Sequence, residues 1–136
     1  NDNIDIYDAK IINVGFDYEI IVDPTRDKTT VLNSVQRELV KYLSEKRYIG
    51  EPFYLTEIFN TINKIDGVVD TTKVTPSLKI GNNYSNPPIT LLDVKSNDGT
   101  YLMAPKNAVY EVKFPSTDIR GTAKWLEDSM PLKTIL

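Results

Sequence analysis

The chain contains no cysteine and no histidine among its 136 residues. The absence of cysteine excludes disulfide bonds and thiolate metal ligands, and the absence of histidine removes the most common general base near neutral pH. Nucleophilic catalysis that depends on either residue is excluded for the same reason. An enzyme built from this sequence would have to work with carboxylates, lysine, tyrosine or serine.

Other features are missing as well. No apolar run reaches the roughly 18 residues that a membrane-spanning helix requires, and the polar start Asn1–Asp5 does not resemble a secretory signal peptide. A net charge of −3 disfavours nucleic-acid binding through bulk positive charge. The length and the apolar content of 40% are those of about one globular domain. Because the chain does not begin with methionine, we expect an excerpt of a longer protein or a processed form.

The acidic residues do not form a recognisable catalytic or metal site. Asp17, Glu19 and Asp23 lie along one predicted strand, where carboxylates more often form a solvated face than a pair that converges across a hydrolase cleft. The acidic stretches 2–8 and 93–99 lack the residues that complete a calcium-binding loop. A glycine-rich phosphate loop is also absent from the sequence. We therefore expect no enzyme activity, no cofactor and no small-molecule substrate, and we expect no nucleic-acid or membrane partner.

Two periodic segments follow one another in the first third of the chain. Apolar and aromatic side chains occupy every second position of the first, as in a half-buried strand: Phe16, Tyr18, Ile20 and Val22. In the second they recur at spacings of three and four, as on one face of a helix: Val31, Val35, Leu39, Tyr42 and Leu43. Pro24 separates the two segments, so the sequence predicts a strand, a turn and a long helix.

Residues 48–74 predict the end of that helix, a second helix and a strand. Gly50 is expected to end the first helix, because glycine adopts left-handed backbone angles without steric cost, and Pro52 prevents continuation. Thr56 is the predicted N-cap of the second helix, and Gly67 the residue that stops it. The β-branched residues that follow predict a strand. At Gly50, Pro52 and Gly67, the backbone geometry therefore determines which type of residue the position can hold.

The predicted order is strand, helix, helix, strand, followed by further strands and loops. Two helices with one apolar stripe each fit one face of a small mixed sheet, which is an α+β fold. We expect this domain to span residues 1–121. Within it, residues 79–88 predict a long loop, residues 89–94 a strand or sheet edge, and residues 109–114 a strand. Residues 122–136 are expected to form an irregular C-terminal tail.

Four aromatic residues are candidates for contacts with another protein. Tyr48, Tyr84 and Tyr101 fall in or beside predicted loops, and Trp125 lies in an otherwise polar C-terminal stretch. Exposed tyrosine and tryptophan are enriched at protein interfaces. The sequence leaves two interpretations of Trp125 open: it folds back on the core, or it anchors a partner.

Three ordered segments carry a resemblance to a known family. They are residues 31–74, the opening Asp8–Asn13 and residues 104–121. The first contains a glycine–acid–proline step after a helix, here Gly50–Pro52, and a Gly-Val-Val-Asp phrase that starts a strand, here Gly67–Asp70. In this combination the chain resembles the J-like baseplate wedge proteins of contractile-tailed bacteriophages, most closely the form in phages similar to T4.

The resemblance covers most of residues 8–121 and implies a structural role in the virion. Family members build a ring-like scaffold around the tail tube from repeated copies, contact other wedge subunits, and relay the change that triggers sheath contraction. It therefore implies self-association, wedge subunits as partners, and a place in the tail baseplate after assembly in the host cytoplasm. Because family members are longer, the chain would be one domain of such a protein. The alternatives are a receptor- or carbohydrate-binding module without an assembly role, and a small hydrolase.

Overall fold

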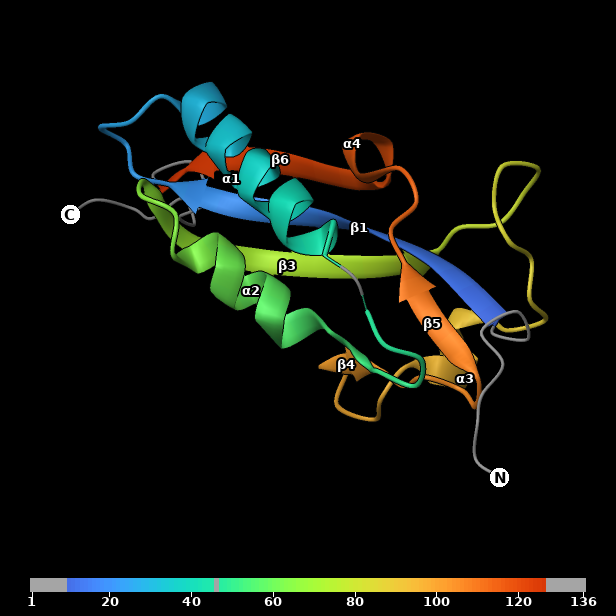
Figure 1. Cartoon of the computed structure of the whole chain (residues 1–136). Helices are drawn as coiled ribbons and strands as arrows, with labels where there is room; N and C mark the ends of the chain where they lie inside the picture. The colour runs from blue at the N-terminus through green and yellow to red at the C-terminus, as the bar shows by residue number, and fades with distance from the viewer. Residues whose placement is uncertain (1–9, 46, 127–136) are drawn as a thin grey trace.

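The computed structural model describes residues 10–45 and 47–126. This part of the chain forms a four-stranded sheet and a two-stranded sheet, with the two longer helices on one face of the larger sheet (Figure 1). The elements follow in the order β1 (Lys10–Val22), α1 (Lys28–Leu43), β2 (Phe53–Tyr54), α2 (Leu55–Asn63), β3 (Val68–Leu78), α3 (Leu91–Val94), β4 (Tyr101–Leu102), β5 (Ala108–Glu111), α4 (Pro115–Asp118) and β6 (Ile119–Trp125). The predicted α+β class is confirmed.

The long strand β1 lies at the centre of the larger sheet. β3 pairs with it in the antiparallel direction along one side. On the other side, β5 pairs in parallel with Lys10–Asn13 and β6 pairs in parallel with Phe16–Val22. The smaller sheet consists of β2 and β4, paired in the antiparallel direction. The larger sheet is therefore mixed, as the sequence predicted.

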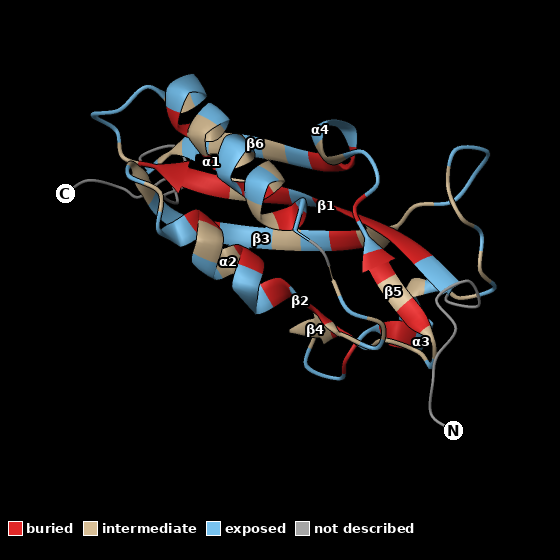
Figure 2. Cartoon of the chain, viewed as in Figure 1, coloured by how far each residue is buried: buried red, intermediate tan, exposed pale blue. Residues whose placement is uncertain are grey.

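The hydrophobic core lies between β1 and the helices (Figure 2). Every second side chain of β1 is at most 2% exposed and faces this layer: Ile12, Val14, Phe16, Tyr18, Ile20 and Val22. The buried side chains of α1 are those of the predicted stripe, except that Tyr42 is half-buried: Val31, Val35, Leu39 and Leu43. Leu55, Ile58 and Ile62 of α2 complete the helical layer. The period of two in the strand and of 3.6 in the helices thus place both apolar faces in one core.

The break between the helices differs from the prediction. α1 ends at Leu43, where Ser44 is the C-cap residue, so Gly50 does not end the helix. Gly50 has a φ of 84° in the turn before β2. α2 begins at Leu55 without a side-chain cap, so the assignment of Thr56 as N-cap is wrong. The apolar stripe of α1 stops at Leu43. The helix therefore ends where its buried face ends, before the chain reaches Gly50.

Gly67 lies in the turn between α2 and β3, beyond the helix end at Asn63. Its φ is 96°, and a Cβ atom on it would lie 2.7 Å from Cγ2 of Val31. Both the backbone angle and the space therefore require glycine. Pro52 is half-buried and directly precedes β2.

Two further assignments need correction. Residues 89–94 do not form a strand; they contain the short helix α3, which Thr90 and Asp93 start with a reciprocal capping box. Residues 122–125 do not belong to an irregular tail, because they form most of β6 and pair with β1. The rest of that predicted tail, from residue 127 onward, lies outside the described residues. The predicted strand at 109–114 is present but shorter, as β5.

None of the helices in residues 10–45 and 47–126 is both long and apolar enough to cross a bilayer.

Candidate functional site

Trp125 packs against the turn between β1 and α1. Its Nε1–H group donates a hydrogen bond of 2.9 Å to the carbonyl oxygen of Arg26. The Nζ atom of Lys28 lies 4.2 Å from the centroid of the indole ring, in cation–π geometry. Of the two interpretations, the structure therefore supports the one in which Trp125 folds back on its own domain.

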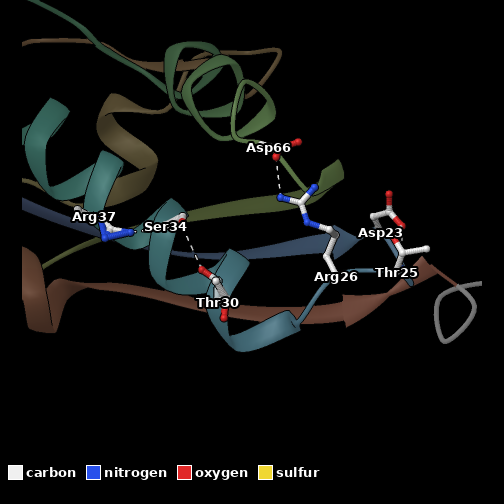
Figure 3. A network of polar contacts seen from close by, with 7 residues as sticks. All are labelled: Asp23, Thr25, Arg26, Thr30, Ser34, Arg37 and Asp66. Carbon is white, nitrogen blue, oxygen red and sulfur yellow. Dashed lines mark hydrogen bonds and ion pairs between the residues drawn. The ribbon is translucent and has the colours of Figure 1, made fainter.

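A polar network surrounds the same turn (Figure 3). Arg26 Nη2 contacts Asp66 Oδ2 at 2.6 Å, which joins the β1–α1 turn to the turn after α2, and this guanidinium lowers the pKa of Asp66. Asp23 Oδ1 accepts hydrogen bonds from the backbone N–H and the hydroxyl of Thr25, both 2.8 Å, and these lower the pKa of Asp23. The network fixes the chain reversal between elements and brings no reactive groups together.

The polar contacts at the start of α1 are also local. Asp27 accepts hydrogen bonds from the hydroxyl and the backbone N–H of Thr30, and both bonds lower the pKa of Asp27. The hydroxyl of Ser34 donates to the carbonyl of Thr30 at 3.1 Å, and Arg37 Nη2 donates to Ser34 Oγ at 3.3 Å (Figure 3). These contacts cap and follow the helix, so their role is structural.

The predicted loop at 79–88 is held by buried polar side chains. The hydroxyl of Tyr84 donates to Asp118 Oδ1 at 2.8 Å, which raises the pKa of Tyr84. The backbone N–H of Ser85 donates to Oδ1 of the buried Asn13 at 2.7 Å. Asp118 is 4% exposed, and its Oδ2 has no hydrogen-bond partner within residues 10–45 and 47–126. Tyr84, which is half-buried, therefore holds a loop in place.

Two tyrosine rings pack together on the two-stranded sheet, and an exposed methionine directly follows its strand β4. The ring centroids of Tyr54 and Tyr101 are 5.8 Å apart across β2 and β4, on the face opposite the buried side chains of Phe53 and Leu102. Tyr54 is 46% and Met103 45% exposed. We call Tyr54, Tyr101 and Met103 the β2–β4 patch. The sequence indicates Tyr101 only, because Tyr54 lies within the apolar run Phe53–Leu55.

The four predicted contact residues do not form one cluster. Tyr48 is 80% exposed, and its backbone N–H donates to Glu51 Oε1 at 2.9 Å. Tyr84, Tyr101 and Trp125 contact α4, β2 and the β1–α1 turn respectively. A receptor-binding tip would gather exposed aromatic side chains on one surface, so this arrangement counts against that alternative.

The carboxylates of β1 face the sheet surface opposite the helices. Glu19 lies between two lysines, 3.8 Å from Lys73 Nζ and 3.4 Å from Lys124 Nζ. Asp17 is exposed nearby on the same face, whereas Asp23 follows the end of the strand. No group of three or more acidic side chains able to hold a metal ion occurs in the described part of the chain.

A scan against protein-family models and a search of curated proteins found no match for the chain. The resemblance described above therefore depends on the three sequence segments themselves. Residues 31–74 form one continuous part of the fold, from α1 to β3, and residues 104–121 contain β5, α4 and the start of β6.

Proposed function

We propose that the chain is a structural domain of the baseplate wedge of a contractile phage tail. The observation that carries the proposal is the segment that resembles the J-like wedge proteins, residues 31–74, whose two helices share one hydrophobic core with β1. In this role the domain contributes to a ring-like scaffold through protein–protein contacts. It also relays the change that triggers sheath contraction. Its place would be the tail baseplate, with other wedge subunits and further copies of itself as partners.

The β2–β4 patch supports a contact role. Tyrosine and methionine are over-represented at protein interfaces: tyrosine buries a large area at a small cost in side-chain entropy, and methionine adapts its shape to the partner surface. The rings of Tyr54 and Tyr101 pack against each other at a tilted angle of 47°, and the adjacent strand residues Phe53 and Leu102 anchor the opposite face of the two-stranded sheet in the core, so the patch has a rigid support. A rigid exposed surface of this kind suits a lasting subunit contact.

Hydrogen bonds between the layers support a role in relaying a structural change. The hydroxyl of Tyr18 in β1 donates to Gln36 Oε1 at 2.7 Å, and Gln36 Nε2 donates to the carbonyl of Ile119 at 2.8 Å. One side chain of α1 thus connects the central strand with β6. Satisfied, partly buried hydrogen bonds of this kind make the packing of the layers rigid, and rigid packing is what a domain that passes on a displacement requires.

Analytical ultracentrifugation of the full chain, alone and mixed with the wedge subunits encoded by the same phage, tests the contact role. We expect a complex that is weakened when Tyr54→Ser and Tyr101→Ser are combined. Tyr48→Ser, at an exposed tyrosine outside the patch, serves as the matched control and should leave the complex intact. A chain that stays monomeric with every wedge subunit would contradict the proposal.

A further inference from the structure

Residues 79–88 connect two anchored parts of the chain without entering the core themselves. Leu78 before the segment and Ile89 after it pack against the hydrophobic core. No residue between them is buried, and Ile80 is 69% exposed (Figure 2). Segments that bury little apolar surface open at a lower free energy than the core does. We call residues 79–88 the strap.

The strap is closed on itself by hydrogen bonds between its two halves. The backbone N–H of Gly81 donates to Asn86 Oδ1 at 2.9 Å, and Asn86 Nδ2 donates to the carbonyl of Gly81 at 3.1 Å. The backbone N–H of Tyr84 donates to the same carbonyl at 3.2 Å. All three bonds lie within the strap and do not depend on its contacts with the rest of the domain. They therefore favour movement of the strap as one unit.

Polar groups hold the strap against β1 and against the connection between β5 and α4. The backbone N–H of Ser85 donates to Oδ1 of the buried Asn13 at 2.7 Å. Lys113 Nζ donates to a backbone carbonyl of the strap. The ring of Tyr84 meets the ring of Phe114 edge-on, with the ring centroids 5.6 Å apart. These contacts can be broken without removing an apolar side chain from the core.

The contact between Tyr84 and Asp118 is the most deeply buried of this set. The hydroxyl of Tyr84 donates to Asp118 Oδ1 at 2.8 Å, and Asp118 is 4% exposed. The other carboxylate oxygen has no hydrogen-bond partner in the described part of the chain. Removing the donor of a buried carboxylate costs more than removing an exposed contact, because the carboxylate is left without a partner. This hydrogen bond therefore holds the strap most strongly.

Gly15 of β1 lies beneath the same contact. A Cβ atom on Gly15 would lie 2.6 Å from the carbonyl oxygen of Asp118 and 2.6 Å from Cε of Lys79, the first residue of the strap. Asp118 and the start of the strap therefore close over β1 from two sides, at a position that has no side chain.

We propose that the strap opens and closes as a unit over Gly15 and Asp118 while the core stays folded, with the Tyr84–Asp118 hydrogen bond as its latch. In the closed state, donors of the strap occupy two buried acceptors, Asn13 Oδ1 and the Asp118 carboxylate. Opening uncovers both. The strap thus controls access to these two groups, and this holds whether or not the domain belongs to a baseplate.

Hydrogen exchange of the full chain, followed by amide NMR at increasing urea below the unfolding transition, tests whether the strap opens alone. The Ser85 amide should exchange faster than the Ile20 amide and with little dependence on urea, because local opening exposes little surface. Ile20, in the central strand and 0% exposed, should exchange through global unfolding and respond steeply to urea. The same urea dependence at both amides would overturn the proposal.

Tyr84→Phe tests the latch, because it keeps the ring beside Phe114 and removes only the hydroxyl. We expect exchange at the Ser85 amide to become at least about tenfold faster, as the loss of a hydrogen bond to a carboxylate implies. Tyr101→Phe removes a tyrosine hydroxyl from β4, outside the strap, and is the matched control that should leave this rate unchanged. Equal rates in the two variants would show that the Tyr84 hydroxyl is not the latch.

Labelling of carboxyl groups with a water-soluble carbodiimide and glycine amide supplies a second measurement. Peptide mass spectrometry should show faster labelling of Asp118 in Tyr84→Phe than in the parent chain. The exposed Asp17 should be labelled at the same rate in both proteins. Faster exchange at Ser85 without faster labelling of Asp118 would show that the strap moves without uncovering the carboxylate, and would overturn the proposal.

Discussion

The ring of Tyr18 lies so close to Gly121 that a Cβ atom on the glycine would be 2.1 Å from Cζ of the tyrosine. The two residues are opposite each other in the parallel pairing of β1 and β6. The same tyrosine donates its hydroxyl to Gln36 of α1, and burial raises its pKa. Strand β6 therefore fits beside β1 because one of its residues has no side chain.

Replacing that glycine should disturb the β1–β6 contact. We expect Gly121→Ala to lower the free energy of unfolding by about 1–3 kcal/mol, as overpacking does in a filled core. Urea unfolding measures the change. In a Tyr18→Leu background the ring is gone, so the cost of Gly121→Ala should be smaller, and the two substitutions should not be additive.

The control for this pair is Thr122→Ala, an exposed neighbour in the same strand, which should change stability by no more than about 0.5 kcal/mol. An equal cost of Gly121→Ala in both backgrounds would show that the Tyr18 ring does not set the requirement for glycine.

The apolar stripe of α1 gives a second prediction. Leu39 is 0% exposed in the core, and Leu39→Ala should cost about 2–5 kcal/mol of unfolding free energy through lost burial and the cavity left behind. Glu38→Ala, one position earlier on the exposed side, should cost less than about 0.5 kcal/mol. Thermal or urea unfolding of both variants compares the two faces of the helix, and similar values would contradict the placement of the stripe.

A third prediction concerns Trp125, the single tryptophan of the chain. Trp125→Phe keeps an aromatic ring near Lys28 but removes the hydrogen bond to the Arg26 carbonyl, so a loss of about 1 kcal/mol is expected. Trp125→Ala should cost more, because the packing of the ring is lost as well. Urea unfolding followed by circular dichroism measures both, and an alanine variant as stable as the parent chain would contradict the docked position.

The N-cap residue of α1, Asp27, makes the free energy of unfolding depend on pH. Hydrogen bonds from Thr30 lower the pKa of Asp27 in the folded state, below the value of about 3.9 typical of an unfolded chain. The contribution of this carboxylate is therefore complete above about pH 5 and is lost as the pH falls through the folded-state pKa. Asp27→Asn keeps a capping oxygen but does not titrate.

The measurement is the unfolding free energy of the parent chain and of Asp27→Asn between pH 2 and pH 7. The difference between the two proteins should be constant above about pH 5 and should change in favour of the variant as the pH falls below about 4. Parallel profiles over the whole range would show that the Asp27 carboxylate contributes nothing specific.

Elements with strong periodicity could be predicted from the sequence. The alternation from Phe16 to Val22 and the stripe from Val31 to Leu43 each match one buried face, because burial of one face leaves a regular trace in the order of residues. Together with the strand after Gly67, they determine the strand–helix–helix–strand core.

The features that the sequence did not predict, β6 and the exposure of Tyr54, have a common physical cause. β6 was not recognised because a strand with Gly121 and Ala123 toward the helices has small residues on its inner face, so its alternation is weak. The reason for the small residue at Gly121 is the Tyr18 ring, which is about a hundred residues away in the sequence and becomes a neighbour only in the fold. Tyr54 was missed for a similar reason, because its exposure depends on the pairing of β2 with β4. Such long-range contacts leave no local pattern.

The central claim, that the domain belongs to a contractile-tail baseplate, is tested most directly by where the chain is found in the virion. Particles of the phage that encodes it would be purified, their baseplates separated from tails and capsids, and each fraction analysed by quantitative peptide mass spectrometry. The account predicts peptides of this chain in the baseplate fraction, in a fixed ratio to the wedge subunits. Their absence from the particle, or their recovery with the capsid alone, would contradict it.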